Sequence, residues 1–146
     1  MAFVRNKNQQ ITFNDNTYGL TARSQRILKK SWSEHFSQDI FPLINEERFA
    51  VLYSDNPATR PNTPVNVIIG LFILKEIYNH TDDDLLEELI FDVCYQYALH
   101  TTSYDEQPVS DRTLSRFRER LYAYEQATGI DLMKAEMESL AEAFVS

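Results

Sequence analysis

Apolar residues are densest between residues 63 and 78, and the rest of the chain is patterned around that segment. Its apolar side chains do not keep to one stripe of a helical wheel but go nearly all the way round it. A soluble helix that is apolar on most sides must be covered by other elements. The pattern therefore predicts the central helix of a small domain. Its apolar residues are Val65, Val67, Ile68, Ile69, Leu71, Phe72, Ile73, Leu74 and Ile77.

The start and the end of this segment favour a helix over a strand. Thr63 can cap the helix, and Pro64 fits the first turn, where its missing N–H costs nothing. A buried strand over residues 65–74 is the alternative, since a short apolar run does not by itself distinguish the two. The proline-first start, the length and the polar ending Lys75-Glu76 favour the helix.

The pattern before the central helix is less regular. Residues 1–20 are rich in Asn and Gln with scattered apolar positions, which predicts a basic, loosely ordered arm. Thr21 can cap a short helix, and Trp32 and Phe36 are spaced to share a buried face. Residues 46–53 then fit a further helix. The inward side chains of that helix are predicted to be Phe49, Leu52 and Tyr53.

Two helices are predicted after the central one. Thr81 begins the first, with acids in its first turn, where the helix dipole favours negative charge. Ser110 or Asp111 caps the second, which runs from residue 112 to about 127 and is ended by Gly129. The apolar face of the first is predicted to consist of Leu85, Leu86, Leu89, Ile90 and Val93, with the helix continuing, kinked or straight, through Tyr95 and Tyr97 to Leu99.

These segments, with a final amphipathic helix over residues 132–144, predict a compact all-α bundle of about five or six helices. One domain at 21–146 accounts for the length, because two full domains rarely fit in 146 residues. The sequence has no run of eighteen apolar residues and no secretory leader pattern, so no membrane span is expected. The single cysteine, Cys94, cannot form an intrachain disulfide, and a cytoplasmic protein is expected.

Charge is distributed unevenly along the chain. The net charge of -8 argues against a protein that coats nucleic acid non-specifically. Residues 31–100 hold 3 cations and 12 carboxylates, whereas residues 1–30 hold 6 cations and 1 carboxylate. Four arginines also crowd into the nine positions 112–120. An acidic body with a basic arm and one arginine-rich helix is compatible with an anionic partner.

The arginine-rich helix has two distinct faces at 100° per residue. One side is apolar, which predicts that it packs inward. Arginines and hydroxyl groups fall roughly opposite. Arg suits bidentate contacts to phosphate or to guanine in the major groove, and Ser and Thr suit phosphate. The inward residues are Leu114, Phe117, Leu121 and Tyr124, and the outward residues are Arg112, Thr113, Ser115, Arg116 and Arg120.

A helix held from behind by the core is a workable recognition helix, presented as in a helix-turn-helix protein. The alternative is a solvated face whose arginines pair with nearby acids, of which the chain has many. Arg118 lies at the flank of the apolar side and could cross the core to pair with an acid such as Asp84 or Asp92. The residues predicted to be structural are Leu71, Leu74, Leu114, Phe117, Arg118 and Leu121.

The sequence contains no complete active site. Five acids between residues 82 and 88 could suggest a metal site, but acids are common in the first turn of a helix. The three histidines lie too far apart for a local ligand pattern, and Cys94 in an apolar setting is expected in the core. No nucleophile motif, glycine-rich phosphate loop or CxxC pair occurs. We therefore expect no catalytic residue, no metal and no cofactor.

Four blocks of sequence carry a family resemblance. The first is RPNTPVNVIIGL at residues 60–71, followed by ILKE at 73–76. The second runs from Thr81-Asp82 to Leu86-Glu87, and the third joins Phe91-Asp92 to Tyr97-Ala98-Leu99. The fourth is PVSDRTLSRFRERL at 108–121. In this order, and over about residues 45–122, they resemble the N-terminal domain of bacterial insertion-sequence transposases whose catalytic half is a DDE ribonuclease-H-like domain.

The resemblance implies a role in transposition. It implies recognition of double-stranded DNA at the terminal inverted repeats of the element, and self-association of the transposase. In that family, cutting and strand transfer belong to a downstream domain with metal-binding carboxylates, for which this chain has no room. By the resemblance, the chain is a non-catalytic part of a transposase, either an excised domain or a truncated gene product.

Two alternative functions of different classes follow, of which the first is preferred, and a domesticated fragment with a purely structural or regulatory role is a weaker third. The first is DNA recognition by the arginine-rich helix, with phosphate contacts from the basic arm. The second is an interaction module that forms a homo-oligomer or docks on the catalytic domain of the same polypeptide. The predicted DNA-binding residues are Ser110, Arg112, Thr113, Ser115, Arg116, Arg120, Lys29 and Lys30. The second function would use the acidic surface and four aromatics expected to be exposed, Tyr95, Tyr97, Tyr104 and Tyr122.

Overall fold

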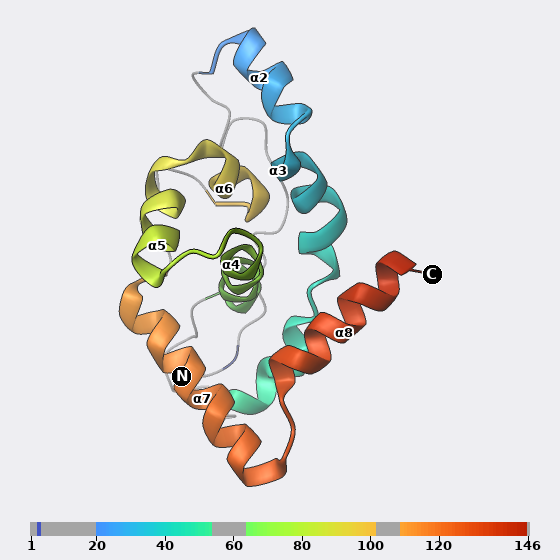
Figure 1. Ribbon diagram of the computed structural model, residues 1–146, viewed down its shortest axis with the longest axis vertical. Helices are drawn as coiled ribbons and strands as arrows, with labels where there is room; N and C mark the ends of the chain where they lie inside the picture. The colour runs from blue at the N-terminus through green and yellow to red at the C-terminus, as the bar shows by residue number, and fades with distance from the viewer. Residues whose placement is uncertain (1–2, 4–19, 54–63, 102–108, 146) are drawn as a thin grey trace.

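A computed structural model describes residues 3, 20–53, 64–101 and 109–145 of the chain. All the regular elements in these ranges are helical, which confirms the all-α class. Figure 1 shows α4 almost end-on in the middle, with the other helices arranged around it. The elements are α2 (Ala22–Lys29), α3 (Trp32–His35), η1 (Phe36–Ile40), η2 (Phe41–Leu43), η3 (Glu46–Leu52), α4 (Val65–Tyr78), α5 (Asp82–Phe91), α6 (Val93–Ala98), α7 (Asp111–Thr128) and α8 (Leu132–Val145).

Helix α4 is the predicted central helix, and it is covered on all sides. Each residue from Val65 to Leu74 is buried, as a helix without a polar stripe requires. At Gly70 a Cβ atom would clash with the side chain of Leu99, so the glycine permits the close approach of the segment that follows α6. The last turn emerges from the core, and Ile77, predicted to be inward, is exposed there.

The two ends of α4 are stabilised in different ways. Pro64 occupies the N-cap position and offers no side-chain acceptor. The buried carboxylate of Glu46, in η3, accepts a hydrogen bond from the Asn66 N–H at 3.2 Å instead, and a negative group is favourable at a helix N-terminus. Pro64 was predicted in the first turn and instead precedes it, and the predicted cap Thr63 lies outside the described residues. Asn79 ends the helix in the left-handed conformation, with φ 55°.

The elements before α4 follow the sequence pattern closely. Helix α2 begins at Thr21, whose hydroxyl accepts a hydrogen bond from the Ser24 N–H at 3.1 Å. The segment predicted as a helix over 46–53 is a 3₁₀ helix, η3, with Phe49 fully buried and Tyr53 partly buried against the core. Of the predicted arm at residues 1–20, the structure describes Phe3 and Leu20. The ring of Phe3 lies 6.0 Å from that of Tyr53.

The segment after α5 corrects two predictions. Helix α5 ends at Phe91, Asp92 is extended, and its side chain accepts from the Cys94 N–H to begin α6. This break turns α6 towards α3, so Tyr95 and Tyr97 are buried and the prediction that they are exposed is wrong. Ile90, predicted to be inward, is exposed at the end of α5. Tyr104 lies outside the described residues, and Tyr122 is exposed as expected.

Helix α8 is fixed to η3 by a buried carboxylate. Glu136 accepts from Arg48 Nε at 2.8 Å and from the Asn45 N–H at 2.9 Å. Two donors satisfy a charge that would be unfavourable if it were buried alone. Within the described ranges, no helix combines the length and the hydrophobicity that crossing a membrane requires.

Candidate nucleic-acid interface

The arginine-rich helix α7 has well-defined ends. The Ser110 hydroxyl accepts from the Thr113 N–H, and the Thr113 hydroxyl accepts from the Ser110 N–H, both at 3.3 Å. This reciprocal capping box fixes the first turn. Gly129, with φ 78°, ends the helix in the left-handed conformation. The hydroxyls of Ser110 and Thr113 are therefore already engaged in capping, although both were predicted to face DNA.

The inner face of α7 packs on the core as the helical wheel predicts. Leu114 and Phe117 are buried, and the Phe117 ring lies between those of Phe49 and Phe72, with centroid distances of 5.8 Å and 5.9 Å. Phe72 belongs to α4 and Phe49 to η3, so α7 is backed by the central helix and by the segment that caps it. The flanking residues Leu121 and Tyr124 are partly buried against the same core.

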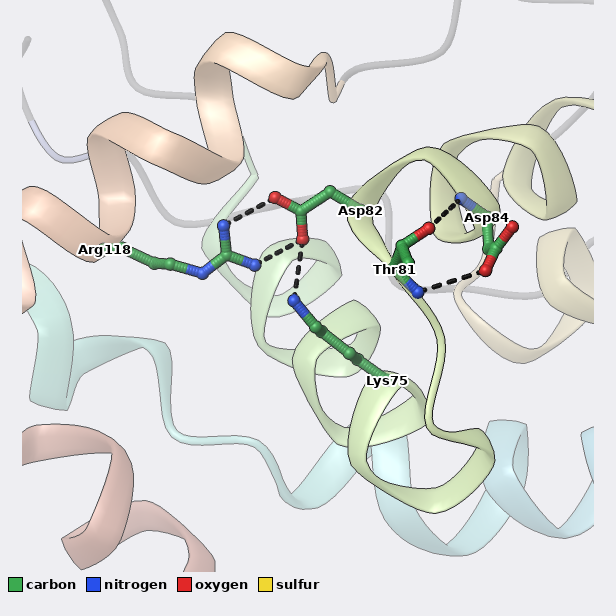
Figure 2. A network of polar contacts seen from close by, with 5 residues as sticks. All are labelled: Lys75, Thr81, Asp82, Asp84 and Arg118. Carbon is green, nitrogen blue, oxygen red and sulfur yellow. Dashed lines mark hydrogen bonds and ion pairs between the residues drawn. The ribbon is translucent and has the colours of Figure 1, made fainter.

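Arg118 ties α7 to the start of α5. Its two terminal nitrogens donate to the two carboxylate oxygens of Asp82 at 2.6 Å and 2.5 Å, and Lys75 Nζ donates to the same carboxylate at 2.9 Å (Figure 2). The guanidinium also lies 5.0 Å from the centre of the Phe72 ring. Arg118 thus pairs with an acid of α5. The partner is Asp82, whereas the sequence suggested Asp84 or Asp92.

The electrostatics of this cluster follow from its hydrogen bonds. The bonds from Arg118 hold the pKa of Asp82 at about 2, below its ordinary 3.8, and those from Lys75 add to the effect. Asp84 accepts from the Thr81 N–H and completes the capping box of α5, which lowers its pKa (Figure 2). Two of the three acids in this turn are therefore engaged in structural contacts. In the described part of the chain, no three His, Cys, Asp or Glu residues are grouped to hold a metal ion.

The outer face of α7 carries its remaining arginines. Arg112, Ser115 and Arg116 are exposed, and Arg112 and Arg116 lie one helical turn apart. Arg120 is different, because its guanidinium lies 4.9 Å from the centre of the Tyr53 ring and its side chain is partly buried. Burial raises the pKa of the Tyr53 phenol, and the nearby Arg120 offsets part of that shift. Two arginines are thus presented to solvent, and a third rests on the core.

The predicted phosphate contacts Lys29 and Lys30 are not brought next to this face. They lie at the end of α2, which occupies one end of the long axis in Figure 1, whereas α7 runs towards the other end. Both side chains are exposed. The structure therefore brings Arg112, Ser115 and Arg116 together on one surface and places the two lysines elsewhere.

The other side chains with reactive groups, Ser37, His100 and Cys94, are partly or fully buried in the fold. The Ser37 hydroxyl lies 2.9 Å from His100 Nε2, and the ring of His100 packs 4.4 Å from that of Phe41. Cys94, predicted in the core, is half-buried, and burial raises the pKa of its thiol. A raised pKa opposes formation of a thiolate nucleophile. These contacts connect segments of the fold.

Sequence reasoning missed two residues that shape the candidate interface. Asp82 forms the ion pair that holds Arg118, and the ring of Tyr53 packs against the guanidinium of Arg120. The first-turn position of Asp82 marked it as an acid favoured by the helix dipole, which gives no information about a partner on another helix. Tyr53 was predicted to be inward, and an arginine stacked on its ring could be found only from the three-dimensional arrangement.

The comparison with protein families decides the class of the chain. The family described as Transposase domain (DUF772) matches residues 25–120, which is more than half of the chain. The chain belongs to this family. The matched region begins within α2 and ends at the Tyr53-stacked Arg120 of α7. It includes the central helix, the Ser110–Thr113 capping box and the Arg118–Asp82 pair, whereas Gly129 and Glu136 lie outside it. No curated protein and no solved structure is significantly similar to the chain.

Proposed function

We propose that this transposase domain recognises double-stranded DNA at the terminal inverted repeats of its element through the outer face of α7. One observation carries the proposal. Two exposed arginines, Arg112 and Arg116, stand one turn apart on a helix whose opposite face is buried and whose orientation is fixed by an ion pair. The proposal gives the domain a binding role and leaves strand cleavage to a separate domain of the transposase.

The geometry suits a helix that enters the major groove. That groove, about 12 Å wide, admits an α-helix, and an arginine can pair with the O6 and N7 atoms of a guanine. Arg112 lies in the first turn of α7, and recognition helices commonly contact base edges through residues near their N-terminal end. Arg116 lies one turn further along and reaches the same groove. Ser115 lies beside Arg112 on the helix surface and can donate to a phosphate.

The contacts behind α7 make this presentation rigid. Binding is favoured when the contacting groups are already held in the bound orientation, because less conformational entropy is then lost. The Arg118–Asp82 pair and the Phe117 packing supply that rigidity. Arg120 lies on Tyr53 and is proposed to make at most a flanking phosphate contact. The capping hydroxyls of Ser110 and Thr113 act indirectly, by fixing the first turn.

The acidic character of the chain predicts specific rather than general DNA binding. Asp111 and Glu119 are exposed on the same helix as the arginines, and the net charge is -8. Few phosphates can therefore be neutralised, and with two or three phosphate contacts the logarithm of the affinity should fall with the logarithm of salt at a slope of about -2 to -3. Discrimination would come mainly from base contacts.

The test is fluorescence anisotropy with two labelled duplexes of equal length, one carrying the terminal inverted repeat of the element and one a shuffled sequence. Arg116→Ala should weaken binding to the repeat by about 1–3 kcal/mol if Arg116 contacts a base, and should reduce the preference over the shuffled duplex. Lys134→Ala is the matched control, because it removes an exposed cation from α8. Equal affinity of the wild-type chain for both duplexes would contradict recognition of the repeat.

A charge-retaining variant separates base contacts from phosphate contacts. Arg116→Lys keeps the positive charge but loses the planar fork that makes bidentate bonds. If Arg116 contacts a guanine, this variant should lose preference for the repeat nearly as far as Arg116→Ala does. If it contacts phosphate, Arg116→Lys should keep most of the affinity, and the base contact would have to be assigned to Arg112.

A further inference from the structure

Helix α2 presents a basic face with an exposed apolar residue at its edge. At 100° per residue, three cations lie opposite Leu28, the one buried residue of this helix, and one isoleucine lies at the edge of this basic side, next to Arg23. The isoleucine, Ile27, is 59% exposed. The residues of this face are Arg23, Arg26, Ile27 and Lys30, and all four are exposed.

Helix α5 presents a face of the opposite charge. Its inner side is formed by Leu85 and Leu89. The opposite side carries acids in the first half of the helix and two large apolar residues at its end, of which Phe91 is 79% exposed. A phenyl ring so far into solvent is unusual here, because the other phenylalanine side chains that the structure describes are buried, except for Phe3, which packs partly buried against the core. The residues of this face are Asp83, Asp84, Glu87, Ile90 and Phe91, and all are exposed.

The two faces match in charge and in spacing. Arg23 lies four residues before Ile27, and Glu87 lies four residues before Phe91. When the apolar side chains of two parallel helices meet, a cation therefore meets an anion one turn away. With the helices antiparallel, Lys30 takes the place of Arg23. We propose that a second copy of this chain binds here, with α2 of one copy on the outer face of α5 of the other.

The position of α2 favours a partner from another copy. An isolated helix of eight residues is marginal in water, and α2 buries only Leu28 against its own chain. It projects at one end of the molecule in Figure 1, while α5 lies on the flank. DNA would also attract the cations of α2, but it offers no apolar partner for Ile27 along its phosphate backbone, whereas α5 offers both kinds of group. This contact is independent of the role proposed for α7.

Sedimentation velocity on the whole chain over a range of concentrations tests the contact. The wild-type chain should self-associate, and the association should weaken as salt is raised. Reversing the charge of either face, with Arg23→Glu and Arg26→Glu or with Asp83→Lys and Glu87→Lys, should weaken self-association about tenfold or more, because like charges then face each other. All four positions are exposed, so each variant should keep the helical circular dichroism spectrum of the wild type.

Mixing the two charge-reversed variants is the decisive step. The α2-reversed chain should bind the α5-reversed chain and restore the complex, since each face then again meets its opposite charge. Phe91→Ser should weaken self-association without changing net charge, and Arg116→Ala should leave it unchanged. The proposal is overturned if the wild-type chain stays monomeric at high concentration, or if the mixed variants do not associate. It is equally overturned if reversing α2 abolishes DNA binding and leaves self-association intact, which would assign α2 to nucleic acid.

Discussion

Helices α4 and α7 come from the same family domain but differ in how the fold uses them. In α4 ten consecutive residues are buried, and its charged Lys75 and Glu76 lie in the last turns. In α7 only Leu114 and Phe117 are fully buried, and most of its other side chains reach solvent. A helix buried on all sides can support neighbouring elements but has no surface with which to bind. The difference is consistent with the proposal that α4 supports the fold and α7 binds DNA, and it predicts that substitutions in the two helices have separable effects.

The largest effect is expected in α4. Leu71→Asp places a carboxylate at a fully buried position in the core, a change that should remove more stability than a domain of this size has. The variant should lack a cooperative thermal transition, measured by circular dichroism. Arg116→Ala is the matched control on α7 and should change the free energy of unfolding by less than about 0.5 kcal/mol. A folded Leu71→Asp variant would contradict the central position of α4.

The next largest effect is expected on the inner face of α7. Phe117→Ala removes a ring packed between Phe49 and Phe72 and should lower the free energy of unfolding by about 3–5 kcal/mol. Tyr122→Ala, on the exposed side of the same helix, should change it by less than about 0.5 kcal/mol. Urea denaturation of both variants gives the comparison. Similar losses in the two variants would mean that α7 does not have one buried and one exposed side.

A smaller effect is expected at the link between α5 and α7. Asp82→Asn weakens the charge-assisted bonds from Arg118 and Lys75 and should cost about 1–3 kcal/mol at neutral pH. Because the pKa of Asp82 is about 2 in the folded chain and near 3.8 when unperturbed, the unfolded state binds more protons between these values. The contribution of Asp82 is therefore complete above about pH 4 and is lost as the pH falls towards 2.

The pH dependence of stability checks this link directly. Denaturation of the wild type and of Asp82→Asn should differ at pH 7 and should converge as the pH falls from about 4 to 2. Asp83→Asn changes an exposed neighbour in the same turn and should follow the wild type. A constant difference between the wild type and Asp82→Asn across this range would rule out a depressed pKa at Asp82.

A still smaller effect is expected at the N-cap of α7. Ser110→Ala removes the acceptor for the Thr113 N–H and should cost about 1 kcal/mol. Ser110→Asp keeps an acceptor at this position and should recover most of the loss, which urea denaturation can measure. If Ser110→Ala leaves stability unchanged but weakens DNA binding, the hydroxyl contacts DNA directly, as the sequence first suggested.

Local signals made several of the helix ends predictable from the sequence. Thr21, Thr81 and Ser110 each cap a helix through bonds to groups within three residues, and Gly129 needs only its own backbone conformation. The continuous apolar run likewise predicted a buried central helix without knowledge of its neighbours. Such features depend on residues that are close in sequence, so they can be found from the sequence without the three-dimensional structure.

Contacts between distant segments were not predictable in the same way. The acid chosen by Arg118 depends on how α5 is turned against α7, and Asp84 is already used by Thr81. Tyr95 and Tyr97 are buried because Asp92 breaks the helix and redirects α6, which periodicity alone could not show. For the candidate interface, the helical wheel predicted that Arg112 and Arg116 point outward, and both are exposed in the structure. The contact between Arg120 and Tyr53 could be found only from the three-dimensional fold. Whether these arginines bind DNA stays a prediction.

One measurement tests the division between support and binding most directly. The double variant Arg112→Ala and Arg116→Ala should unfold in urea within about 0.5 kcal/mol of the wild type. Its anisotropy titration should show binding to the inverted-repeat duplex weakened at least as far as in Arg116→Ala, and preference over the shuffled duplex lost. A double variant that is as stable as the wild type and still prefers the repeat would contradict the account, because the outer face of α7 would then have no part in recognition.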